Sequence, residues 1–122
     1  MTAKTRLVVQ TIKDVTVVTF ADSSLVDMLH IDQAGRELYE LVDKQDRRKI
    51  VIDLAKLTHL SSAVLSVFIA LQKRIDGVGG KLILCGLSKQ LQKLFKVSNL
   101  HKLFTFAADE DAAMEKLGVV IA

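Results

Sequence analysis

Two adjacent hydroxyl side chains, Ser61 and Ser62, are the residues whose types and spacing could support chemistry in this chain. They lie between an apolar run that begins at Ile50 and a second apolar run that begins at Ala63. Serine just before an apolar run is typical of a helix N-cap, because the hydroxyl accepts hydrogen bonds from the free backbone N–H groups of the first turn. The pair therefore either only starts a helix or marks a site, and the pair alone does not distinguish these alternatives.

The runs on either side of the serines predict a buried strand followed by a buried helix. Residues 50–54 are apolar and largely β-branched apart from Asp53, which suits a strand covered on both faces. Residues 63–71 are apolar on nearly every side except at Ser66, which suits a helix whose first turns are largely buried. We therefore expect the serines at the carboxyl end of a central strand, where open α/β sheets commonly present their sites.

No catalytic or metal-binding pattern accompanies the serines. The three histidines, His30, His59 and His101, lack ligand spacing with acids or with the one cysteine. The glycines of a nucleophile elbow are absent around the serines, and His59 lies too close in the chain to act as their base. The glycines between residues 77 and 80 follow a helix, which is the wrong end for an anion-binding loop. We therefore expect no enzyme activity, no metal and no cofactor.

The composition is that of one globular domain, expected to span residues 1–122. Half of the residues are apolar and a quarter are charged, and 122 residues suffice for a single core. A net charge of +3 and only six aromatic rings argue against direct nucleic-acid binding. One cysteine, Cys85, excludes an internal disulfide and is predicted to be inert core. No signal peptide is evident and no apolar run approaches the roughly 18 residues of a membrane span, so we expect a cytoplasmic protein without a membrane partner.

Hydrophobic periodicity predicts the element order ββαβαβαβα. The expected strands are 7–12, 15–20, 50–54, 82–85 and 103–106, and the expected helices are 31–44, 63–76, 89–96 and 109–117, with 21–29 mostly loop. Asp32 is expected to cap the first helix and Ser88 the third, whose Lys89, Lys93 and Lys96 form an outer basic stripe. The alternation after the first hairpin implies an α/β fold with a mixed, mostly parallel sheet and about four helices.

Several short motifs follow one another in a specific order between residues 7 and 117. They are Val51-Ile52-Asp53-Leu54, Leu60-Ser61-Ser62-Ala63, Gly79-Gly80-Lys81-Leu82-Ile83-Leu84, Gly86-Leu87-Ser88, Val97-Ser98-Asn99-Leu100 with Leu103-Phe104, and the acidic start of the last helix. Their order and spacing resemble the STAS domain, in particular the stand-alone bacterial anti-sigma-factor antagonists. The resemblance implies the single-domain α/β fold given above.

The resemblance also implies a regulatory switch. In such antagonists, an anti-sigma factor with serine-kinase activity phosphorylates a serine at the start of the second helix. The unphosphorylated antagonist binds that kinase and frees the sigma factor, and a phosphatase restores the binding form. The family motif usually reads Asp-Ser-Ser/Thr-Gly, and its modified first serine aligns with Ser61, which leaves Ser62 as the second candidate. The implied partner-binding residues are Ser23, Ser24, Thr58, His59, Leu60 and Ala63.

The sequence departs from the family motif at three positions near the serines. Leu60 replaces the acid, Ala63 replaces the glycine, and Leu65 fills a position that is often glycine. The missing acid removes a polar group that helps to position the serine or the magnesium of the kinase. Two alternatives therefore stand beside the switch: a phosphorylation-independent STAS module in a signalling assembly, and a domain that binds a small ligand or nucleotide at the second helix. For the switch and for both alternatives, we expect the protein to be a monomer.

Overall fold

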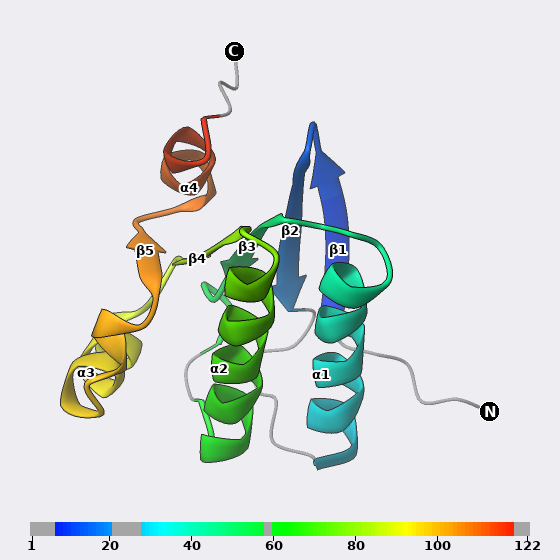
Figure 1. The fold of residues 1–122 in the computed structure, drawn as a ribbon. Helices are drawn as coiled ribbons and strands as arrows, with labels where there is room; N and C mark the ends of the chain where they lie inside the picture. Colours follow the sequence, from blue (N-terminus) through cyan, green and yellow to red (C-terminus); the bar gives the residue numbers. More distant parts are fainter. Residues whose placement is uncertain (1–6, 21–27, 58–59, 119–122) are drawn as a thin grey trace.

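The computed structural model describes residues 7–20, 28–57 and 60–118, which form one five-stranded sheet with helices on both faces (Figure 1). The strands are β1 (Leu7–Ile12), β2 (Val15–Phe20), β3 (Lys49–Asp53), β4 (Lys81–Cys85) and β5 (Thr105–Ala107). The helices are α1 (Met28–Asp43), α2 (Ser62–Gly77), α3 (Lys89–Val97), the 3-10 turn η1 (Leu100–Lys102) and α4 (Glu110–Lys116). The predicted order ββαβαβαβα is confirmed, with η1 added between α3 and β5.

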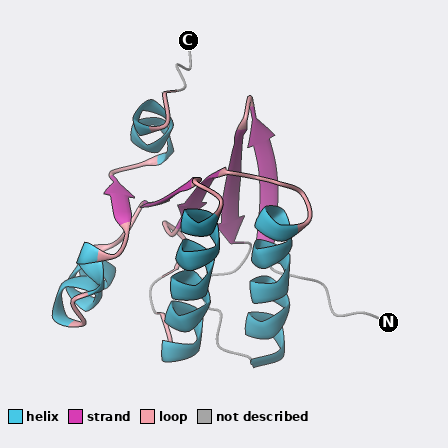
Figure 2. Ribbon diagram, in the orientation of Figure 1, coloured by secondary structure: helices cyan, strands magenta, loops and turns pink. Residues whose placement is uncertain are grey.

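The strands lie in the order β1-β2-β3-β4-β5. The first two pair antiparallel, and each later neighbour pairs parallel. Figure 2 shows the strands and the helices by type in the same orientation as Figure 1. A two-residue turn joins β1 to β2, and its first residue, Lys13, takes a positive φ of 56°. The second turn residue, Asp14, accepts a hydrogen bond of 2.8 Å from Lys49 Nζ. This ion pair connects the hairpin to the start of β3.

Alternate residues of the central strands bury opposite faces of the sheet. In β2, Val18 and Phe20 join the larger core beneath α1, α2 and α3, whereas Val15 and Val17 join a smaller core beneath α4. The same alternation in β3 places Ile52 in the larger core and Val51 in the smaller one. Both faces are therefore covered, which explains why the central strands are apolar almost without interruption.

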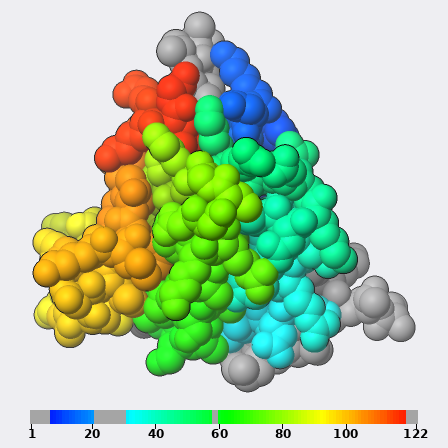
Figure 3. Space-filling model, in the orientation of Figure 1, coloured from blue at the N-terminus to red at the C-terminus, as the bar shows by residue number. Residues whose placement is uncertain are grey.

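Helices α1 and α2 lie side by side over the larger core (Figure 3). They approach closely at Gly35, where an added Cβ would lie 3.3 Å from a methyl group of Val67. Further along, Arg74 of α2 donates a hydrogen bond to Asp43 of α1 and places its guanidinium 4.3 Å from the centre of the Tyr39 ring. These contacts fix the position of α2 relative to α1.

Two expectations at element ends are wrong. Helix α1 begins at Met28 rather than at residue 31, so Asp32 lies inside the helix, on an exposed position, and is not its cap. Strand β5 begins at Thr105 rather than at residue 103, because η1 continues to Lys102 and Leu103 N donates to Leu100 O at 2.9 Å. Of the loop expected at 21–29, residues 21–27 lie outside the described residues, and the remaining two belong to α1.

Candidate functional site

The candidate site is the α2 corner, which we define as Leu60, Ser61, Ser62 and Ala63. The chain reaches this corner from the carboxyl end of β3, at the middle of the sheet. Directly after the strand, Leu54 N donates to the carbonyl of Cys85 at 2.8 Å, and Leu57 N donates to Leu54 O at 3.0 Å. Leu54 and Leu57 are both buried. The segment that leaves the strand is therefore fixed to the sheet before the corner begins.

Ser61 is the N-cap of α2. Its backbone is extended, with φ −78° and ψ 164°, and its Oγ accepts a hydrogen bond of 3.2 Å from Val64 N. The predicted capping role of the serine pair is thus confirmed for Ser61, while Ser62 is the first helical residue. Both serine side chains are exposed. The corner therefore presents two neighbouring hydroxyl groups at its surface.

Apolar neighbours hold the two serines in this exposed position. Leu60 and Ala63 are half-buried and pack against the larger core, as does Leu65. Leu60 and Leu65 occupy the N′ and N4 positions of the helix start, which are the two positions of a hydrophobic staple. The two leucines that depart from the family motif therefore stand at the two positions where a staple needs apolar residues. A staple of this kind fixes the angle at which the chain enters a helix.

The corner can accept negative charge without losing its helix. The residues Leu60 to Ala63 carry no charge, and the free N–H groups of the first turn of α2 point toward the corner. The positive end of the helix dipole stabilises an anion there by about 0.3–1 kcal/mol. Phosphorylation of either serine is therefore compatible with the folded domain.

The structure brings together four of the eight predicted site residues. Leu60, Ser61, Ser62 and Ala63 form the corner, whereas the other four lie outside the described residues: Ser23, Ser24, Thr58 and His59. The end of β2, which precedes the segment with Ser23 and Ser24, does lie beside the first turns of α2. Its last residue, Phe20, packs against Phe68 with ring centroids 6.5 Å apart.

The acid of the central strand does not belong to the corner. Asp53 accepts a hydrogen bond of 2.9 Å from Ala55 N, and it also hydrogen-bonds Glu110 at the start of α4. This hydrogen bond, followed by burial and the charge of Asp53, raises the pKa of Glu110 to about 7. The sequence analysis did not identify this pair. The available signal was the alternation along the strand. Asp53 follows Val51 by two residues and therefore lies on the same face of the sheet, which α4 covers.

The described residues outside the corner also bear on the expectations for a reactive cysteine, a metal site and a membrane span. Cys85 is buried, and burial together with nearby carboxylates raises the pKa of its thiol to about 12, which suits the predicted inert core residue. Among the described residues, no three His, Cys, Asp or Glu side chains gather in a way that could hold a metal ion. None of the described helices has both the length and the apolar character needed to cross a membrane.

Comparison with known proteins gives consistent results for family and fold. The sequence profile of the STAS domain matches residues 6–113. BtrV of Bordetella bronchiseptica, named as an anti-sigma factor antagonist, is 35% identical over 89 residues, which cover 73% of this chain and 76% of BtrV. The crystal structure of TM1081 from Thermotoga maritima, described as an anti-sigma factor antagonist, superposes with a TM-score of 0.80 at 17% identity, covering 92% of this chain and 94% of TM1081.

The anti-sigma factor antagonist SpoIIAA has been solved in two forms that both share this fold. The unphosphorylated form gives a TM-score of 0.72 at 14% identity and covers 93% of this chain and 99% of SpoIIAA. The phosphorylated form, from Bacillus, gives a TM-score of 0.70 at 16% identity and covers 91% of this chain and 98% of that structure. The fold of SpoIIAA has therefore been observed both with and without phosphorylation.

Proposed function

The chain belongs to the STAS domain family and is similar to the anti-sigma factor antagonists, and on this premise we propose that it is a binding protein switched by phosphorylation. Its partner is an anti-sigma factor or a related serine kinase. The unmodified protein binds the partner through the α2 corner, and phosphate on Ser61 releases it. A serine phosphatase then returns the protein to its binding form.

One observation carries this proposal: Ser61 and Ser62 are both exposed at the start of a helix whose remaining first turns are anchored in the core. The side chains of Val64 and Phe68 are buried, and Leu60 and Ala63 are half-buried beside the serines. A partner can therefore contact a neutral surface that combines two hydroxyls with apolar atoms. Such a surface suits a partner that desolvates it on binding.

A phosphate on this surface would oppose binding through charge and desolvation. It adds about −1.5 to −2 charges and three acceptor oxygens. A partner built for a neutral hydroxyl would leave that charge unpaired and poorly solvated, which costs several kcal/mol. A loss of about 3 kcal/mol corresponds to roughly a hundredfold weaker binding. The same phosphate is tolerated by the domain itself, because it lies at the positive end of α2.

The proposal is tested by phosphorylation in the presence of the partner kinase. The protein is incubated with the serine kinase and ATP, and the modified residue is located by mass spectrometry. We expect phosphate on Ser61 in the wild type, no phosphate at this position in Ser61→Ala, and retained modification in Ser62→Ala. Calorimetry should then show at least tenfold weaker binding of the phosphorylated protein. A protein that remains unmodified and does not bind the kinase would contradict the proposal.

A second candidate is a phosphorylation-independent STAS module that contacts a signalling partner through the same corner. The staple positions of Leu60 and Leu65 favour it, because these leucines stand where the family motif has an acid and a frequent glycine. For such a module, Ser61→Ala and Ser61→Asp should both bind the partner within about twofold of the wild type. Loss of binding in Ser61→Asp alone would instead support the switch.

A further inference from the structure

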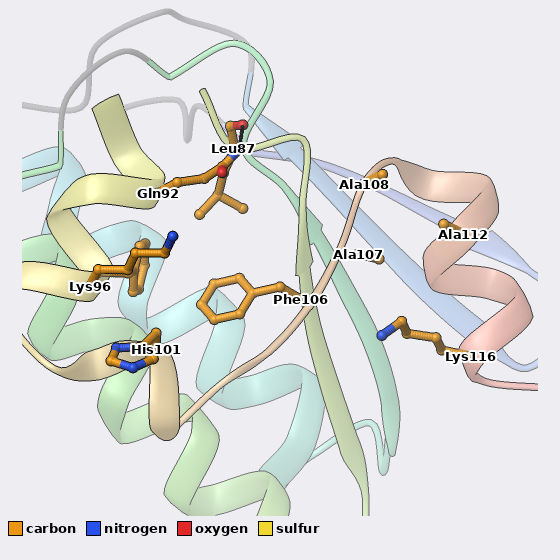
Figure 4. Close-up of a pocket in the computed structure, with 10 residues that line it drawn as sticks. Leu87, Gln92, Lys96, His101, Phe106, Ala107, Ala108, Ala112 and Lys116 are labelled. Carbon is orange, nitrogen blue, oxygen red and sulfur yellow. Dashed lines mark hydrogen bonds between the residues drawn. The ribbon is translucent and has the colours of Figure 1, made fainter. Parts of the chain in front are cut away.

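A groove crosses the edge strand β5 between α3 with η1 on one side and α4 on the other (Figure 4). We call it the β5 groove. Its volume is about 430 Å³, which lies within the usual range of small-molecule sites, roughly 300–1,000 Å³. Its lining contains no residue of the α2 corner. The groove is therefore a feature that the proposed partner binding does not use.

The floor of the β5 groove is aromatic. Phe95 of α3 is buried, and its ring meets the half-buried Phe106 of β5 edge to face, with centroids 5.3 Å apart. Phe104 supports both rings from behind at 5.6 and 6.4 Å. The ring of Phe106 points from β5 toward Lys96 and His101 (Figure 4). Because its neighbours hold this ring in place, its open side offers a preformed surface for another apolar or aromatic group.

The ionisable groups of the lining are all basic. They are Lys96 of α3, His101 of η1 and Lys116 of α4, and the lining includes no carboxylate. Among the residues that the structure describes, none of these three side chains takes part in an ion pair. The groove thus combines basic groups with an aromatic floor, and its lining has no acidic group to neutralise them. Such a site is complementary to an apolar molecule that carries one negative group.

We propose that the β5 groove binds a small apolar carboxylate. The carboxylate lies between Lys96 and His101, and the apolar body covers the ring of Phe106 and extends toward Ala112 of α4. A small molecule fits the groove better than a peptide strand, because β5 has only three residues and its free edge offers a very short hydrogen-bonding ladder. Lys96 and His101 beside the aromatic floor together select an anion that carries an apolar body.

The experiment uses three probes that share one body and differ in the head group: 2-naphthoate, 2-naphthalenemethanol and 2-naphthylmethylammonium. Binding to the full chain is followed by amide chemical shifts and by calorimetry. We expect 2-naphthoate to shift the amides of β5 and α4 and to bind about tenfold more tightly than the neutral alcohol, since it alone forms a charge-assisted contact. Equal binding of the three probes, or shifts that avoid β5, would overturn the proposal.

Matched variants test the residues that define the groove. Lys96→Gln should weaken 2-naphthoate about tenfold and leave the alcohol unchanged, whereas Lys93→Gln on the same helix, outside the groove lining, should change neither. Ala112→Met should block all binding, because Ala112 is half-buried in the groove lining and a longer side chain there fills the groove. Unchanged affinity in both Lys96→Gln and Ala112→Met would refute the assignment. An acidic peptide that displaces 2-naphthoate at much lower concentration would assign the groove to a protein partner instead.

Discussion

Two serine caps, Ser61 of α2 and Ser88 of α3, have nearly the same geometry. Both follow the carboxyl end of a parallel strand, and both are exposed. Their backbones are extended, with ψ values of 164° and 165°, and each Oγ accepts a hydrogen bond of 3.2 Å from the backbone N–H three residues later. Capping alone therefore does not distinguish a candidate site from a residue that only starts a helix.

The surroundings of the two caps differ. Ser61 is followed by Ser62 and Ala63 in a corner without charge, whereas Ser88 is followed by Lys89 and the basic outer face of α3. Helix α2 also buries five residues and α3 only two, so the first cap stands on the more firmly anchored helix. A neutral, partly apolar surface beside a second hydroxyl is therefore what makes the α2 corner a candidate docking surface.

Partner binding should separate the two caps most strongly. We expect Ser61→Asp to weaken binding of the anti-sigma factor about a hundredfold, because the carboxylate is desolvated without a partner at the interface. The matched Ser88→Asp should stay within about twofold of the wild type. Calorimetry with the purified partner measures both variants. Equal losses in the two variants would remove the distinction between the corner and an ordinary cap.

Thermodynamic stability should not separate the caps. Ser61→Ala and Ser88→Ala each remove one side-chain acceptor from a free N–H group, so each should lower the free energy of unfolding by about 1 kcal/mol. Urea unfolding followed by circular dichroism measures this change. A loss at Ser61 that exceeds the loss at Ser88 by more than about 1 kcal/mol would mean that the corner has a structural role beyond its cap.

The third capped helix, α4, differs from α2 and α3 because an ionisable residue in its first turn should make stability depend on pH. Asp109 Oδ1 accepts a hydrogen bond of 2.8 Å from Ala112 N, and the next residue, Glu110, has its pKa raised from 4.5 to about 7 by Asp53. Between these values the folded state binds more protons than the unfolded state, so the free energy of unfolding should fall as pH rises from about 4.5 to 7. The change should be on the order of 1 kcal/mol, because Glu110 is partly screened by solvent.

The control for this effect is another acid on the same helix. Glu110→Gln keeps a hydrogen-bonding side chain but cannot ionise, so it should remove this fall in stability, whereas Glu115→Gln should retain it. Urea unfolding at pH 5 and pH 8 provides the measurement. An unchanged pH profile in Glu110→Gln would show that the pair with Asp53 does not control it.

The sequence was sufficient to predict the two serine caps and most of the fold, because both are set by local patterns. Serine before an apolar run predicted the starts of α2 and α3, and nearly continuous apolar runs predicted the central strands, whose residues the structure buries alternately on the two faces. The same local rule failed at Asp32, since an aspartate is also tolerated inside a helix where it is exposed to solvent. Half of the predicted site, including Thr58 and His59, lies outside the described residues.

Features that depend on tertiary contacts were not predictable in this way. Asp53 and Glu110 are far apart in the sequence and meet only because α4 packs on the second face of the sheet. The β5 groove combines residues of α3, η1, β5 and α4, and the basic stripe that includes Lys96 was its one visible sign in the sequence. The shape of the groove depends on where η1 ends and β5 begins. Hydrophobic periodicity predicted this boundary wrongly, because it placed the start of the strand at residue 103.

The smallest expected effect concerns charge at the two caps in the isolated protein. Aspartate is as good an N-cap as serine, and its charge gains about 0.3–1 kcal/mol from the helix dipole at low salt. Ser61→Asp and Ser88→Asp should therefore each leave the free energy of unfolding within about 0.5 kcal/mol of the wild type at high salt. At low salt, Ser88→Asp should gain slightly more because of its basic neighbours. Urea unfolding at two salt concentrations measures both variants. A loss above about 1 kcal/mol in Ser61→Asp would attribute its weakened partner binding to a damaged helix start and not to charge at the interface.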